Sequence, residues 1–224
     1  MTYRTDSDIF MPYGSLRNTT GKESDRDLQQ LQELIAGKSK LAAWFVSNCA
    51  TPGGREQFVG ELKKHMPIDV YGKCNPLGPQ CPKNNVTYCR NMVGRTYKFA
   101  LALENSHCQD YVTEKFFFPL EDGVVPVVLH RSTHEKLAPT SDAFIAADDF
   151  RSVKDLANYL KHLDRDVGAY WKHFAWRRSS KVDKRFAASY MCRLCEKITQ
   201  RKTETAEKPP YYSYKDIHTW WNVC

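Results

Sequence analysis

The chain lacks any long hydrophobic run, and no stretch approaches the roughly 18–20 consecutive apolar residues of a membrane helix. No signal peptide is recognisable, since Met1 is followed by polar and charged residues. Internal repeats, low-complexity blocks and nucleic-acid recognition motifs are also missing. We therefore interpret the net charge of +7, which is spread along most of the chain, as a solvated basic surface and expect no nucleic-acid partner.

Cysteine, by contrast, is plentiful. The 224 residues include eight cysteines, a high and even number for a cytosolic enzyme. Two N-x-[ST] sequons, at Asn18 and Asn85, are candidate glycosylation sites. Together these features favour an oxidising lumen.

Strand-like apolar runs alternate with helix-like amphipathic segments along the chain. We expect strands at Leu41–Ser47, Ile68–Tyr71, Phe99–Leu103, Val124–Leu129 and Ala143–Ala146, and helices at 24–36, after Gly53-Gly54, at 113–122, 153–163, 166–177 and 181–198. Residues 72–96 are expected to form a loop. This alternation predicts an α/β fold, a Rossmann-like parallel sheet with helices on both faces. We divide the chain into a lead-in segment (1–23), the Rossmann-like domain (24–198) and a linker with a C-terminal tail (199–224).

The segment Tyr97–Leu129 gathers its polar residues at one strand–helix junction. Thr113 is a candidate N-cap, Gly123 stands where a helix C-cap would be, and Pro119 predicts a short helix. In a parallel sheet, strand ends and the following helix starts share one edge, where ligands bind and helix N-termini attract phosphate. Residues 47–55 and 104–115 should meet at that edge.

The same residues carry a family resemblance. ALENS-x-x-x-DYVTEK followed by GVVPVVL resembles the signature of the α1,3/α1,4-fucosyltransferases, which use GDP-fucose. MTYRTDSDIFMPYG, FVSN followed by Arg55, DDF at 148–150 and Cys192-Arg-Leu-Cys195 also fall in the order seen in that family. The resemblance covers roughly residues 1–200. It implies the C-terminal, donor-binding domain of a GT-B glycosyltransferase.

The resemblance implies roles for five residues. Arg55 and Lys115 would bind the donor phosphates and replace a metal as the neutralising charge. Asn105, Tyr111 and Glu114 would contact the nucleotide or fucose. Without the resemblance, each of the five could equally be structural. Glu104, as a strand terminator, and Asp110, as a cap, are weaker candidates.

Two further motifs are ambiguous. Asp6-Ser7-Asp8 has the D-x-D pattern of metal-dependent transferases, but the resembled family does not rely on such a site, so we assign no metal. Cys192-x-x-Cys195 could be redox-active, form a structural disulfide, bind zinc with Cys74, Cys81 and Cys89, or remain free. The resemblance favours structural disulfides, with Cys74–Cys81 as a second, short-loop bridge.

The implied activity is transfer of fucose, with inversion, from GDP-fucose to an N-acetylglucosamine-containing glycan on a glycoprotein or glycolipid. No cofactor is required. The family's general base is a carboxylate in an N-terminal domain, so we nominate no catalytic residue here. The family's Golgi membrane anchor is likewise expected in a missing N-terminal part. The alternatives are a non-catalytic nucleotide-sugar-binding fragment or pseudoenzyme, and a lectin-like secreted domain.

Overall fold

The structure, a computed structural model, describes residues 1–19, 22–82, 85–183, 186–203, 216 and 219–220. Its centre is a five-stranded sheet in the order β3-β2-β4-β5-β6, in which every neighbouring pair is parallel. The strands are β2 (Lys40–Phe45), β3 (Ile68–Tyr71), β4 (Tyr97–Leu101), β5 (Val125–Val128) and β6 (Ile145–Ala146). The predicted α/β fold with a parallel sheet is confirmed.

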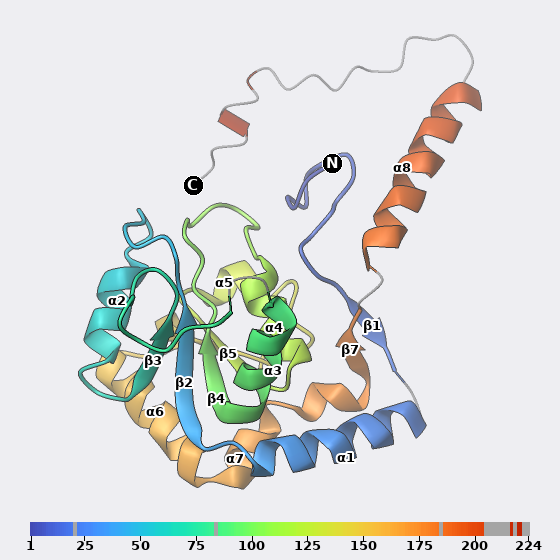
Figure 1. Cartoon of the computed structure of the whole chain (residues 1–224). Coiled ribbons are helices and arrows are strands. Elements are labelled where there is room, and N and C mark those ends of the chain that lie inside the picture. The colour runs from blue at the N-terminus through green and yellow to red at the C-terminus, as the bar shows by residue number, and fades with distance from the viewer. Residues whose placement is uncertain (20–21, 83–84, 184–185, 204–215, 217–218, 221–224) are drawn as a thin grey trace.

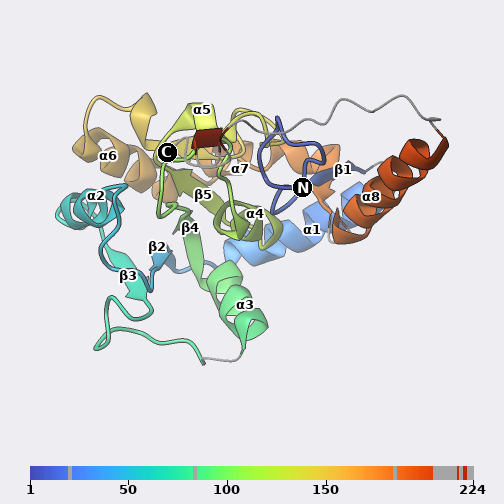
Figure 2. The ribbon, with the colours of Figure 1, turned by 90° about the horizontal axis from the view of Figure 1, so that it is seen from above.

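Helices cover both faces of the sheet (Figures 1 and 2). Helices α2 (Arg55–Leu62) and α6 (Val153–Arg165) pack on one face, whereas α3 (Val86–Thr96) and α4 (Glu114–Glu121) pack on the other. Alternation along the strands explains this arrangement. In β4, Phe99 belongs to the same core cluster as Leu62 and Leu156, whereas Ala100, one position on, belongs to the cluster of the opposite face.

The side on which successive strands are added to the sheet changes between β2 and β4. The chain first adds β3 on one side of β2 and then crosses back to place β4 on the other side. Open α/β sheets bind ligands at this switch point, outside the carboxyl ends of the strands. The loops that follow β2 and β4 therefore define the edge where a site is expected.

The predicted strand–helix–strand unit at this edge is confirmed. Thr113 is the N-cap of α4, and its side-chain oxygen accepts a hydrogen bond from the Lys115 amide. Gly123 follows the C-cap with φ 71°, a left-handed conformation that glycine adopts without strain. The helix has only eight residues and includes Pro119.

Three local predictions are wrong. Residues 86–96 are helix rather than loop, because the Asn85 side chain accepts a hydrogen bond from the Tyr88 amide and caps α3. Residues 166–177 are divided between α7 (Val167–Lys172) and the 3-10 helix η2 (Ala175–Arg178). The segment 181–198 begins as strand β7 (Ser180–Val182), which pairs antiparallel with β1 (Leu16–Asn18), and only then becomes α8 (Phe186–Thr203). Strands of three residues are too short to show a period in the sequence.

The remaining described elements are α1 (Lys22–Ala36), α5 (Arg131–His134) and the 3-10 helix η1 (Ala147–Asp149). Helix α8 extends away from the sheet (Figure 1). No helix of the described residues is long and apolar enough to cross a membrane. Most of the predicted linker and tail after Thr203 lies outside the described residues.

The predicted disulfide pairing is wrong. Cys74 bonds to Cys49, and Cys81 bonds to Cys89. Because β2 and β3 are parallel neighbours, the loops after them meet at one edge, which brings Cys49 and Cys74 together. Cys108 is also disulfide-bonded. These bonds consume the cysteines that a zinc site would have needed.

The Cys192-x-x-Cys195 motif forms no disulfide. Both cysteines lie within α8 and are exposed free thiols. The family-based expectation of a disulfide between them is therefore wrong.

Candidate functional site

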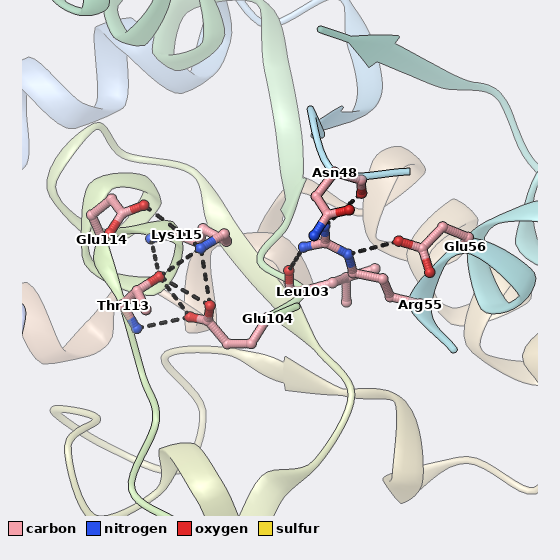
Figure 3. Close-up of polar contacts among 8 residues, drawn as sticks. All are labelled: Asn48, Arg55, Glu56, Leu103, Glu104, Thr113, Glu114 and Lys115. Atoms are coloured by element: carbon pink, nitrogen blue, oxygen red, sulfur yellow. Dashed lines mark hydrogen bonds and ion pairs between the residues drawn. The ribbon is translucent and has the colours of Figure 1, made fainter. Parts of the chain in front are cut away.

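Two basic side chains are anchored to consecutive residues at the end of β4 (Figure 3). Arg55 donates to the carbonyl of Leu103, and Lys115 donates to the carboxylate of Glu104. Arg55 comes from the segment after β2, and Lys115 comes from the start of α4. The switch-point edge therefore brings together both of the cations that the sequence predicted for a donor diphosphate.

Arg55 braces the two loops of this edge. Its Nη1 donates to the Leu103 carbonyl at 2.9 Å, and its Nη2 donates to the Asn48 carbonyl at 2.9 Å. Its Nε donates to the Glu56 carboxylate at 3.1 Å. The residue is only 3% exposed. A guanidinium carries five N–H donors, so one hydrogen on each terminal nitrogen remains outside these bonds.

Lys115 belongs to a compact side-chain network. Its Nζ donates to Glu104 Oε2 at 3.0 Å and to Thr113 Oγ1 at 2.9 Å. Its side chain is 30% exposed, whereas that of Glu104 is 5% exposed. An ammonium has three donors, so one of them lies outside these two hydrogen bonds.

Glu104 occupies the N-terminus of α4. Its carboxylate accepts from the Thr113 amide at 2.7 Å and from the Thr113 hydroxyl at 2.8 Å. A helix N-terminus favours an anion because its amides and dipole point toward it, and here that anion is part of the chain. Glu104 is therefore more than the strand terminator that the sequence suggested. A diphosphate bound here would contact Lys115 while the Glu104 carboxylate also remains bonded to Lys115.

The other predicted residues lie around this network with differing accessibility. Glu114, the first residue of α4, has a side chain that is 44% exposed, with an oxygen 3.6 Å from Lys115 Nζ. Asn105 is partly buried, and its Oδ1 has no hydrogen-bond partner among the described residues. Burial and the nearby negative charge of Glu104 raise the pKa of Tyr111 to about 12, so its hydroxyl stays protonated at neutral pH.

The sequence did not predict that the N-terminal segment packs against this site. The ring of Tyr111 lies 5.1 Å from that of Tyr3 and 6.3 Å from that of Tyr13. Asp110 has φ 59°, and its carboxylate accepts from the amide and the hydroxyl of Thr5 at 3.0 and 2.7 Å. Asp110 therefore fastens the N-terminal segment instead of capping the helix. The tyrosines of the MTYRTDSDIFMPYG segment are the sequence feature that could have indicated this packing.

The D-x-D carboxylates point to separate partners. Asp6 pairs with Arg4 at 2.7 Å, and Asp8 lies 4.0 Å from the Lys197 ammonium. Within the described ranges, no group of three His, Cys, Asp or Glu side chains is placed to hold a metal ion. The two sequon asparagines, Asn18 and Asn85, are both exposed.

A larger groove lies elsewhere, at the amino-terminal edge of the sheet near Gly123. It measures about 890 Å³ and is bordered by α1, β7 and the end of α4. Its charged residues are of both signs, as in the pair between Lys181 and Asp27 at 3.1 Å. None of the predicted site residues lines it, so we place the functional site at the switch-point edge despite its smaller hollow.

Comparison with known proteins identifies the family of the chain. The glycoprotein 3-alpha-L-fucosyltransferase A of Drosophila melanogaster is 36% identical over 231 residues, covering 100% of this chain and 43% of its own. The human 3-galactosyl-N-acetylglucosaminide 4-alpha-L-fucosyltransferase is 38% identical over 224 residues, covering 98% of this chain and 56% of its own. The chain spans about half the length of the curated relatives it matches.

Solved structures share the fold. A crystal structure of an α1,3-fucosyltransferase with GDP superposes with a TM-score of 0.52 at 24% identity, covering 66% of this chain and 44% of that one. A second crystal structure of an α1,3-fucosyltransferase gives 0.51 at 26% identity, covering 62% and 37%. The profile of glycosyltransferase family 10 (fucosyltransferase), C-terminal part, matches residues 35–220. The chain therefore belongs to glycosyltransferase family 10, the fucosyltransferases.

Proposed function

We propose that this chain is the donor-binding part of an inverting α1,3-fucosyltransferase that transfers fucose from GDP-fucose to an N-acetylglucosamine-containing glycan. The observation that carries the proposal is the pair of cations anchored at Leu103 and Glu104, in a chain of this family. A solved protein of the same fold is described as an α1,3-fucosyltransferase with GDP-fucose. By family resemblance, the full-length protein acts in the Golgi lumen.

The two cations supply the charge that the leaving group needs. As the bond from fucose to the diphosphate breaks, negative charge grows on the diphosphate. Lys115 retains one donor outside its two hydrogen bonds, and the buried Arg55 guanidinium adds a fixed positive charge to the same edge. No step of this proposal requires a metal or another cofactor.

Three polar groups suit the neutral parts of the donor. Glu114 is exposed enough to accept hydrogen bonds from ribose or sugar hydroxyls. Asn105 Oδ1, buried without a partner among the described residues, would gain one from a donor hydroxyl or N–H. Tyr111 stays protonated and can donate. The general base that takes the acceptor's proton is expected in the part of the relatives that this chain does not span.

Calorimetric titration of the folded chain with GDP and with GDP-fucose tests donor binding directly. We expect both ligands to bind, and the affinity should fall with increasing salt because charge neutralisation dominates the contact. Absence of measurable heat for either ligand, with folding verified by circular dichroism, would overturn the proposal.

A nucleotide-sugar-binding fragment without turnover is the second candidate. It is favoured by one observation, the coverage of about half of each relative. A transfer assay with labelled GDP-fucose and N-acetyllactosamine or a chitobiose-core glycan separates the two. Turnover by this chain alone would contradict our assignment of the base to another part of the protein.

A further inference from the structure

A second hollow opens beside the cation site, between the ends of β4 and β5. Ala102 and Glu104 border it on the β4 side, and Leu129 and His130 border it after β5. Tyr111 and His134 also line it, together with the polar residues Ser106, His107 and Thr133. Glu104 and Tyr111 therefore belong both to this hollow and to the proposed donor site.

His134 is the unusual member of this lining. It is only 4% exposed, at the end of the short helix α5, and its ring lies 5.0 Å from that of Phe116. Its Nδ1 lies 3.1 Å from the His130 carbonyl oxygen. Its Nε2 is buried and has no hydrogen-bond partner among the residues that the structure describes. A buried nitrogen without a hydrogen-bond partner is unfavourable, so a partner supplied by a ligand would be favourable.

The surroundings fix the chemistry of that nitrogen. Burial lowers the pKa of His134 to about 4, so the ring is neutral at neutral pH. A carbonyl oxygen can only accept, so the proton of the neutral ring resides on Nδ1, which faces His130. Nε2 then carries a lone pair and accepts hydrogen bonds. It would bind a hydroxyl or an N–H group and would not bind a phosphate oxygen.

The size of the hollow selects between those groups. Its volume is about 20 Å³, which is room for roughly one water-sized group. A hydroxyl fits this space, whereas a planar purine does not. Glu104 also lines the hollow, and its carboxylate can likewise accept a hydrogen bond from a hydroxyl.

We propose that His134 is a specificity-determining residue whose Nε2 accepts a hydrogen bond from one hydroxyl of the transferred sugar of the donor. This inference rests on the proposed function, since it requires a nucleotide sugar at the adjacent cation site. In this arrangement the transferred sugar occupies the hollow between β4 and β5, and the nucleotide lies near Lys115 and Glu114.

Binding of GDP and GDP-fucose to a His134→Phe variant tests the assignment. Phenylalanine keeps the packing against Phe116 but removes the acceptor. We expect GDP-fucose to bind about 5–30-fold more weakly, as one lost hydrogen bond implies, with GDP affinity unchanged within about twofold. His134→Gln, which can present an oxygen, should recover part of the loss. Equal weakening of both ligands, or no change in either, would overturn the assignment.

Two measurements remain informative if the variants fold poorly. In the unmodified chain, the ¹⁵N signal of His134 Nε2 should shift on adding GDP-fucose and stay in place on adding GDP. Among GDP-fucose analogues that each lack one ring hydroxyl, one should bind about 5–30-fold more weakly and leave the Nε2 signal unshifted. An unshifted signal at saturating GDP-fucose would mean that the hollow holds a water only, and the assignment would fail. Failure of the native chain to bind either ligand would instead overturn the proposed function.

Discussion

The two cations of the site are held in opposite ways. Arg55 is almost fully buried, and it donates to two backbone carbonyls and a neighbouring carboxylate. Lys115 is about a third exposed and is held only by side-chain oxygens. A disulfide, Cys49–Cys74, also fixes the loop on the Arg55 side. The comparison indicates that Arg55 builds the edge of the site and supplies a fixed charge, whereas Lys115 is the cation that can move to meet a ligand.

Arg55→Ala should have the largest effect. The buried Leu103 carbonyl would lose its donor at a cost of roughly 1–3 kcal/mol, and the partly buried Asn48 carbonyl and the Glu56 carboxylate would lose bonds as well, so we expect the free energy of unfolding to fall by about 3 kcal/mol. GDP-fucose affinity should fall at least tenfold because the loops after β2 and β4 lose their brace. Urea denaturation and calorimetry measure the two effects, with exposed Arg151→Ala as the control. Loss of affinity at unchanged stability would show that Arg55 is purely a ligand contact.

Replacing both Cys49 and Cys74 with serine should lower the stability of the protein by a different mechanism, the loss of the cross-link beside Arg55. The bond closes a loop with a sequence separation of 25 residues, and opening such a loop costs about 3 kcal/mol of stability through the entropy of the unfolded chain. GDP affinity should change much less than in the Arg55 variant. The matched control replaces the free thiols Cys192 and Cys195, which should leave the denaturation midpoint unchanged.

Lys115→Met should weaken ligand binding more than it lowers stability, which is the opposite of the balance expected for Arg55→Ala. We expect GDP to bind about 10–100-fold more weakly because a partly buried charge-assisted contact to phosphate is lost, while the denaturation midpoint falls less than in Arg55→Ala. Exposed Lys136→Met serves as the control for net charge. If the Lys115 variant kept its GDP affinity and lost stability as Arg55→Ala does, the distinction between the two cations would be wrong.

Thr113→Val should give the smallest effect. It removes the N-cap of α4 and the hydroxyl that Glu104 and Lys115 share, which should cost about 1 kcal/mol of stability. Donor affinity should fall only a few fold, because Lys115 keeps its bond to Glu104. Thr113→Ser retains the hydroxyl and should behave like the native chain in thermal unfolding. A serine variant as unstable as the valine one would contradict the assignment of this stability to the hydroxyl.

Patterns that are local in sequence predicted the fold and part of the site correctly. The apolar runs predicted the five strands of the parallel sheet. Thr113 predicted the start of α4, because capping depends on residues within one turn. The bonds from Arg55 to the Leu103 and Asn48 carbonyls could not be predicted in this way. They depend on the folded backbone of two loops rather than on residue types.

Long-range contacts account for most of what the sequence did not reveal. The β1–β7 ribbon joins residues more than 160 positions apart through strands of three residues. The disulfide partners depend on which strands are neighbours, so the pairing of Cys74 with Cys49 followed from the sheet order. Helix α3 is an exception, because its N-cap Asn85 is a local signal that coincides with a sequon.

The attachment of both cations to one dipeptide has a mechanical consequence. Leu103 and Glu104 are joined by a single peptide bond and lie just beyond Ala102, which follows β4, the central strand of the sheet. A shift of this segment by one residue would place a different carbonyl opposite Arg55 and a different side chain opposite Lys115. An insertion or deletion here would therefore disturb the anchoring of both cations at once.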